Sequence, residues 1–218
     1  MIVLALDTAG ADCAVALYDS DGDRVLAEVT ETIGKGHAER LMAVFDQVLD
    51  RAGLTLDKVG RIAVTIGPGS FTGIRVGVAA ARGFALSLGV PVVGVSTLEV
   101  LAAGALRQAP GRAVIAAMDA KRDEVYLQPF DGQGHPAGEP QALTVDDARA
   151  FAAGFEGDIV GSATRLIGNP ATEAAPDTFP ISIVARLGAK KPAGEKPKPL
   201  YLRGPDVKPQ AGFAVARM

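Results

Sequence analysis

The stretch VTIGPGSFTGIRVG, residues 64–77, decides the fold, because it joins a strand, a sharp turn and a helix without a break. The β-branched run Ile62–Ile66 predicts a buried strand. Gly67–Gly69 interrupts that strand, and Ser70 is placed to cap a helix that runs to about Leu88. A strand, a glycine turn and a helix start can together hold an anion, although the spacing is neither that of a P-loop nor that of a dinucleotide fingerprint.

The helix expected after Ser70 is apolar on nearly all sides, with only Arg75 and Arg82 charged. Such a composition predicts burial on nearly all sides. Small residues recur at every fourth position and form a ridge that lets a second helix approach closely, namely Gly73, Gly77, Ala81 and Ala85. Two interpretations stay open: a central helix enclosed within one domain, or a helix–helix interface with another protein.

Composition sets bounds on the class of protein. The chain has 218 residues, 48% of them hydrophobic, and a formal net charge of −3, so its overall charge does not suit nucleic-acid binding. The one cysteine, Cys13, excludes an intrachain disulfide and fits a reducing compartment. The first strand meets Asp7 too early for a signal peptide, and no apolar run is expected to span a membrane. We therefore expect a cytoplasmic protein.

The order of elements predicts a mixed sheet with helices on its faces. Strands are expected over residues 2–6, 13–18, 24–30, 62–66 and 92–95, and helices over residues 37–52, 71–88 and 97–106. After a linker at residues 108–111 the opening pattern repeats at an offset of 112 residues, so that Asp7 falls on Asp119 and Asp12 on Glu124.

The second copy is expected to be abbreviated. It has room for helices over residues 145–153 and 181–187 and a strand over residues 158–161. The Lys- and Pro-rich run 190–198 predicts a mobile linker, whereas Pro199–Asp206 is too apolar for a mere tail.

A duplicated unit with an acid at the end of its first strand resembles the actin-like ATPase (ASKHA) fold. This resemblance implies an α/β protein of two RNase H-like lobes, each a mixed sheet flanked by helices, over residues 1–107 and 108–218. Within that group the chain is similar to the TsaB (YeaZ-like) family. The matching segments are Thr65–Arg75, Gly94–Glu99, Leu6–Thr8, Gly36–Leu41 and Pro199–Arg203.

The resemblance to TsaB implies a non-catalytic partner subunit. Its complex makes N6-threonylcarbamoyladenosine at position 37 of ANN-decoding tRNAs, and the family pairs with the catalytic subunit TsaD and supports TsaE. ATP and metal would then belong to the complex, tRNA would be contacted only indirectly, and this chain would bind no cofactor of its own. The two metal-binding histidines of TsaD fall here on Thr97 and Leu101, which are not replacements for imidazole.

The pairing surface of the family is made by the two helices of the first lobe, which would also permit a homodimer. The expected interface residues are His37, Leu41, Phe45, Gly73, Ile74, Gly77, Val78, Ala81 and Arg82. On this expectation Gly77→Leu or Val78→Asp abolishes pairing and leaves the monomer folded.

Two enzymatic alternatives remain. An ATP-dependent kinase or ATPase of the same fold would hold phosphate at Asp7, Thr8, Gly67 and Gly69. A metallopeptidase would need metal ligands, for which the two histidines, His37 and His135, and their sequence surroundings offer no cluster.

Overall fold

Two mixed β-sheets organise the chain, and the structure, a computed structural model, describes residues 1–168 and 176–203. The first sheet has the strand order β3-β2-β1-β4-β5. In it β1 pairs antiparallel with β2 and parallel with β4. The strands are β1 (Ile2–Asp7), β2 (Asp12–Asp19), β3 (Arg24–Thr32), β4 (Val59–Gly67) and β5 (Val92–Ser96).

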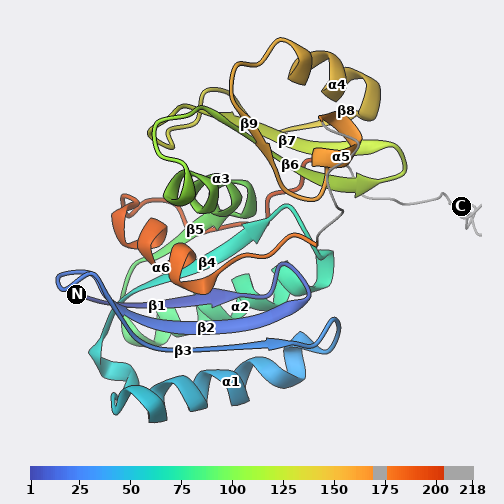
Figure 1. The fold of residues 1–218 in the computed structure, drawn as a ribbon. Coiled ribbons are helices and arrows are strands. Elements are labelled where there is room, and N and C mark those ends of the chain that lie inside the picture. The colour runs from blue at the N-terminus through green and yellow to red at the C-terminus, as the bar shows by residue number, and fades with distance from the viewer. Residues whose placement is uncertain (169–175, 204–218) are drawn as a thin grey trace, which may run out of the picture.

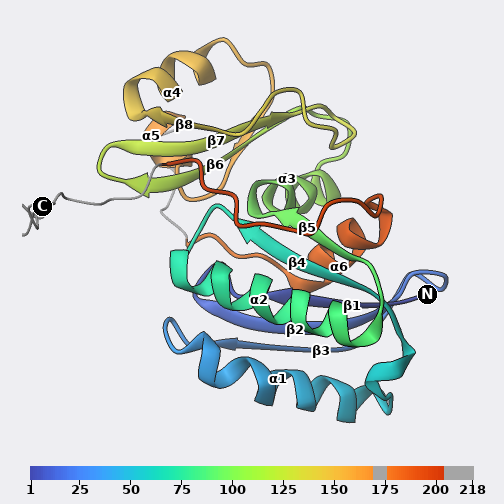
Figure 2. The same cartoon turned by 180° about the vertical axis from the view of Figure 1, so that it is seen from behind.

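Helices cover both faces of the first sheet (Figures 1 and 2). On one face lie α1 (His37–Ala52), against β2 and β3, and α2 (Phe71–Leu88), against β4. The rings of Phe45 on α1 and Phe84 on α2 stack with their centroids 4.7 Å apart, which joins the two helices. The opposite face is covered by α6 (Ile181–Lys190), and the 3-10 helix η1 (Leu56–Lys58) precedes β4.

The second sheet repeats the pairing of the first in shortened form. Its order is β8-β7-β6-β9, where β6 pairs antiparallel with β7 and parallel with β9. The starts of β1 and β6, and those of β2 and β7, are 112 residues apart, so the predicted repeat is confirmed. The strands are β6 (Val114–Lys121), β7 (Glu124–Phe130), β8 (Gln141–Thr144) and β9 (Asp158–Val160).

Three more helices complete the second half of the fold. One face of the second sheet carries α4 (Val145–Ala153) and the short α5 (Thr164–Ile167). Between the two sheets lies α3 (Thr97–Gln108), which packs on β6 and also contacts β4 and β5 (Figure 1). The predicted class, two mixed sheets flanked by helices with an abbreviated second copy, is confirmed.

Residues from the predicted second lobe return to the first sheet, which the sequence did not indicate. The α6 helix falls within 108–218, yet it packs on β1, β2 and β4. Its Gly188 permits this approach, because a Cβ there would lie 2.2 Å from the Cβ of Ala63. The run 190–198, expected to be a mobile linker, is held at its start, where Lys191 forms a 2.8 Å ion pair with Glu99. Its Pro197 is buried.

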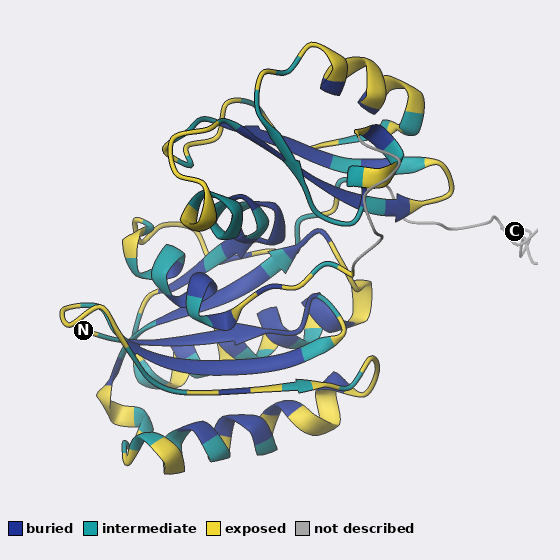
Figure 3. Cartoon of the chain, in the orientation of Figure 1, coloured by how far each residue is buried: buried dark blue, intermediate teal, exposed yellow. Residues whose placement is uncertain are grey.

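The burial of α2 also differs from the expectation. Dark blue follows the strands of both sheets, while exposed positions lie along the outer sides of the helices (Figure 3). The buried residues of α2 are Gly73, Ile74, Gly77, Val78, Ala81 and Ala85. The interpretation of α2 as enclosed on nearly all sides is therefore wrong, because one face packs on the sheet and the other meets solvent.

By length and composition α2 passes the test for a membrane-spanning helix, contrary to the expectation that no apolar run of the chain does so. It is the one helix of the described residues that passes, and only 33% of its window is buried within the subunit. The core helix of a soluble protein passes the same test. The packing of α2 on β4 accounts for its buried face, and its apolar outer face is treated below.

The glycines of α2 meet the turn that follows β1. A Cβ on Gly73 would lie 2.0 Å from the carbonyl oxygen of Thr8, and one on Gly77 would lie 2.4 Å from its hydroxyl oxygen. The Thr8 hydroxyl donates a 2.7 Å hydrogen bond to the carbonyl of Gly73. The ridge of small residues therefore packs against a turn of the same chain. A leucine at position 77 would overlap Thr8, so we no longer expect Gly77→Leu to leave the monomer folded.

We expect Gly73→Ala to lower the free energy of unfolding by about 2 kcal/mol or more, because the new methyl group overlaps backbone that cannot move away. The matched control is Gly83→Ala in the same helix, where an added Cβ meets nothing within 4 Å. That change should raise the stability by up to about 1 kcal/mol through helix propensity. Urea unfolding measures both, and equal effects of the two substitutions would refute the contact.

Candidate functional site

The turn after β1 is the first place to look for ligand chemistry. Asp7 is fully buried, and its Oδ1 accepts hydrogen bonds from the Ala9 amide at 3.0 Å and the Thr65 hydroxyl at 2.6 Å. Its Oδ2 is buried without a hydrogen-bond partner. Burial raises the pKa of Asp7 to about 6, although the hydrogen bonds from Thr65 and Ala9 oppose the rise.

The four residues proposed to bind phosphate lie close together, but they pack against the neighbouring backbone and side chains of the same chain. Thr8 is fully buried, and its hydroxyl is already bonded to Gly73. At the start of α2 the Ser70 amide donates to the Ala9 carbonyl at 2.7 Å. A Cβ on Gly69 would lie 2.3 Å from that same carbonyl oxygen, and one on Gly67 would lie 2.6 Å from Ile74. These residues do not fit a nucleotide phosphate, because polypeptide fills the space next to the turn.

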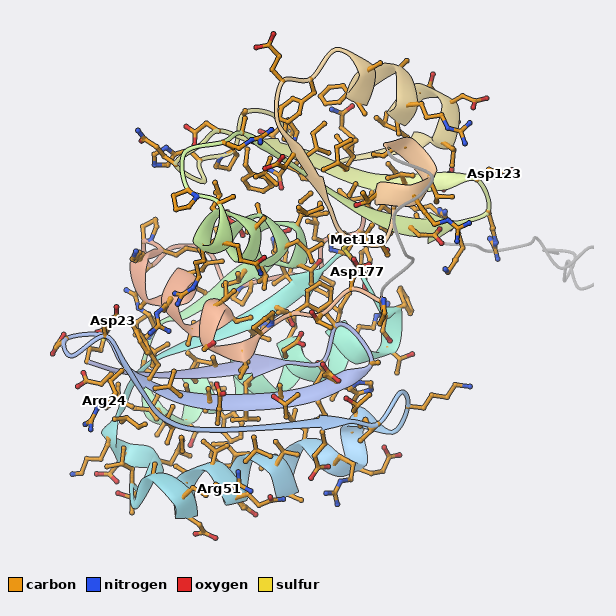
Figure 4. The ribbon with its side chains drawn as sticks, in the orientation of Figure 1. Asp23, Arg24, Arg51, Met118, Asp123 and Asp177 are labelled. Atoms are coloured by element: carbon orange, nitrogen blue, oxygen red, sulfur yellow. The ribbon has the colours of Figure 1, made fainter. Side chains whose placement is uncertain are left out.

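The equivalent turn in the second lobe is also occupied by side chains. The Asp119 amide donates to the Ser162 hydroxyl at 2.9 Å, and that hydroxyl donates to Asp177 at 2.5 Å. Asp177 lies near Met118 where the two lobes meet (Figure 4). Burial raises the pKa of Asp177, while hydrogen bonds from Lys121 hold the pKa of Asp119 low against the effect of its burial. Asp119, Ser162 and Asp177 of this turn are thus hydrogen-bonded to one another.

The positions that align with the metal-binding histidines face the protein interior. Thr97 is fully buried, and its hydroxyl donates to the Pro68 carbonyl at 2.6 Å. Leu101 lies one turn further along α3 and is half-buried. Over residues 1–168 and 176–203 no three His, Cys, Asp or Glu side chains gather closely enough to hold a metal ion.

A solvent-facing apolar surface on α2 is the feature that remains. Thr72 and Ser87 of this helix are exposed, and so are the six residues that we call the α2 outer face: Phe71, Arg75, Ala79, Arg82, Gly83 and Leu86. Leu86 is 79% exposed and Phe71 is 52% exposed, at opposite ends of the helix. On the neighbouring α1 helix Met42 is exposed as well.

The expected interface residues need correction against this geometry. All of them except Arg82 are buried within the subunit, where they pack α1 and α2 on the first sheet: His37, Leu41, Phe45, Gly73, Ile74, Gly77, Val78 and Ala81. A side chain in its own core is not available to a partner. The expected residues thus lie on the faces of α1 and α2 that pack on the sheet, and for α2 the all-apolar composition did not indicate which side that is.

The C-terminal segment docks beside the start of α2. The Arg75 Nε donates to the Tyr201 hydroxyl at 2.9 Å, and the Phe71 and Tyr201 ring centroids are 5.4 Å apart. Arg203 reaches the other lobe, where it pairs with Glu124 and donates to the Ala120 carbonyl. Residues 204–206 of the predicted segment lie outside the described residues.

Comparison with known proteins gives a consistent result. The family model described as TsaD, tRNA N6-adenosine threonylcarbamoyltransferase, matches residues 24–154. The tRNA threonylcarbamoyladenosine biosynthesis protein TsaB of Escherichia coli K12 is 31% identical, over 93% of this chain and 95% of that protein.

Two solved structures are similar over most of the chain. One is an uncharacterized protein with similarity to peptidase YeaZ from Pseudomonas aeruginosa, with a TM-score of 0.76 and 30% identity over 93% of this chain and 99% of that one. The other is YeaZ from Pseudomonas aeruginosa, with a TM-score of 0.72 and 31% identity over 86% of this chain and 90% of that one.

The raised pKa of Asp7 makes a prediction about stability. The folded state holds the carboxyl proton of Asp7 more tightly than the unfolded state does. The contribution of Asp7 to stability is therefore greatest below about pH 4 and is lost as the pH rises through 6. A shift from 3.8 to about 6 corresponds to a loss of about 3 kcal/mol by pH 7. Asp7→Asn should therefore gain about that much at pH 7 relative to its effect at pH 4. Chemical denaturation at both pH values measures this, and an equal effect at each would contradict the raised pKa of Asp7.

Proposed function

The chain belongs to the TsaB family, and on this premise we propose that it acts in the biosynthesis of N6-threonylcarbamoyladenosine in tRNA as a non-catalytic subunit. Its role would be to pair with the catalytic subunit TsaD and to support the entry of TsaE into the complex. Contact with tRNA would be indirect.

The α2 outer face is the observation that carries this proposal. Monomeric proteins rarely expose large apolar side chains together, and such patches mark protein–protein contacts. Leu86 and Phe71 are exposed near the two ends of α2, and Met42 is exposed on the neighbouring helix α1. Full burial of one side chain of this size contributes about 1.5–3 kcal/mol, so a few of them are enough to hold a partner.

The interior of the chain supports a role without catalysis. The turn at Asp7–Ala9 is closed by α2 and offers no room for phosphate, so it gives no support to an ATP-dependent kinase. The hydroxyl of the buried Thr97 donates a hydrogen bond to the Pro68 carbonyl, and the Leu101 side chain has no atom that can bind a metal. Reactive groups are thus expected on the partner.

Pairing is tested with Leu86→Asp, which places a charge at the most exposed apolar side chain of the α2 outer face. We expect the dissociation constant for TsaD of the same organism to rise by about 30-fold or more, equivalent to the loss of about 2 kcal/mol. The control Phe151→Asp changes an exposed aromatic residue on α4 of the other lobe and should bind as wild type does. Isothermal titration calorimetry gives both constants, and unchanged binding of Leu86→Asp would exclude this face.

The cellular role is tested by complementation. In bacteria depleted of their own TsaB, expression of this chain together with its TsaD and TsaE should restore threonylcarbamoyladenosine in total tRNA, as measured by nucleoside mass spectrometry. Leu86→Asp should restore much less than Phe151→Asp. Failure of the wild-type chain to restore the nucleoside, with all three proteins present at normal levels, would argue against the proposed function.

A further inference from the structure

A cavity of about 450 Å³ opens at the C-terminal end of the α2 outer face. It is bounded by α2, by the turn that leads into β5 and by the segment after α6. The residues that matter here are Arg82, Gly83, Leu86, Val90, Gly194 and Lys196. Since Leu86 and Arg82 also belong to the α2 outer face, the cavity is continuous with the proposed partner surface.

Gly83 is the residue that the fold of this chain does not explain. Gly73 and Gly77 have no room for a Cβ, whereas a Cβ on Gly83 would meet no atom within 4 Å. Glycine inside a helix is less favourable than alanine by about 1 kcal/mol. Among the described residues no contact requires a bare backbone at this exposed position.

Charge indicates what a neighbour at this cavity would carry. Two cations line the cavity, Arg82 and Lys196, and neither forms an ion pair or a hydrogen bond with the described residues. No acidic residue is among those that line it.

We propose that this cavity receives an acidic side chain of TsaD, with its aliphatic part against Gly83 and Leu86 and its carboxylate between Arg82 and Lys196. The inference rests on the proposed function, because it assumes that TsaD covers the α2 outer face. A carboxylate held by two cations at the edge of an apolar contact fixes the register of the partner along α2. The Gly83 backbone then lets the acidic side chain lie close to the helix.

The test compares cavity variants in calorimetric titrations with TsaD of the same organism. We expect Arg82→Glu and Lys196→Glu each to raise the dissociation constant at least 10-fold, and Gly83→Val to do so by filling the space. Gly83→Ala, which adds one methyl group, should have a smaller effect. Arg165→Glu, an exposed cation on α5, is the charge control and should not change binding. Circular dichroism confirms that each variant is folded.

A salt series and a charge swap complete the test. Wild-type binding should weaken with added salt, and the dependence should diminish in the double variant of Arg82 and Lys196. Among Asp→Lys and Glu→Lys variants of TsaD, one should restore binding to Arg82→Glu. If wild type binds TsaD but the cavity variants bind equally well, this inference fails while the proposed function stands. If wild type does not bind at all, the proposed function itself fails. If the variants disrupt only self-association of this chain, the occupant is a second copy and the acidic residue of TsaD is excluded.

Discussion

The contact between the turn after β1 and the glycine face of α2 is the constraint on which the rest of this structure depends. Thr8 lies so close to Gly73 and Gly77 that a side chain larger than hydrogen does not fit at either position. The Thr8 hydroxyl donates to the Gly73 carbonyl in the first turn of α2, and the Ala9 carbonyl accepts from the Ser70 amide at the start of the helix. This contact fixes the rotation of α2 about its axis, and so decides which residues reach solvent.

One consequence is a division of roles between the two sides of the helix. The inner side closes the place where a phosphate would approach the first strand, and Asp7 is left there with one oxygen unpartnered in the core. The outer side keeps Phe71 and Leu86 in solvent. A subunit built in this way has given up the space for a ligand at its own turn while it retains an apolar surface. That combination suits a chain that acts by binding another protein.

Much of this architecture could be predicted from local sequence, because local rules decide local structure. Ser70 caps α2 through the Gly73 amide, and the glycines that follow α1 and α2 adopt the left-handed conformation that ends both helices. The repeat of Asp7 at Asp119 indicated the second sheet. The return of α6 to the first sheet could not be predicted, since it depends on a fit between Gly188 and Ala63 that are far apart in the chain. The buried face of α2 was missed for a different reason. Apolar residues occur on all sides of this helix, so their spacing does not indicate which side packs on the sheet.

The glycines of α2 show how the structure separates two explanations that look identical in sequence. Gly73, Gly77 and Gly83 all lower the helix propensity of the same segment, and sequence alone does not show which of them has a close neighbour. For the first two the neighbour is Thr8 of the same chain, and the cost is offset inside the subunit. Gly83 has no such neighbour within residues 1–168 and 176–203, and it lines the same cavity as Arg82 and Lys196. The same residue type therefore serves the fold at one end of the helix and leaves room for a partner at the other.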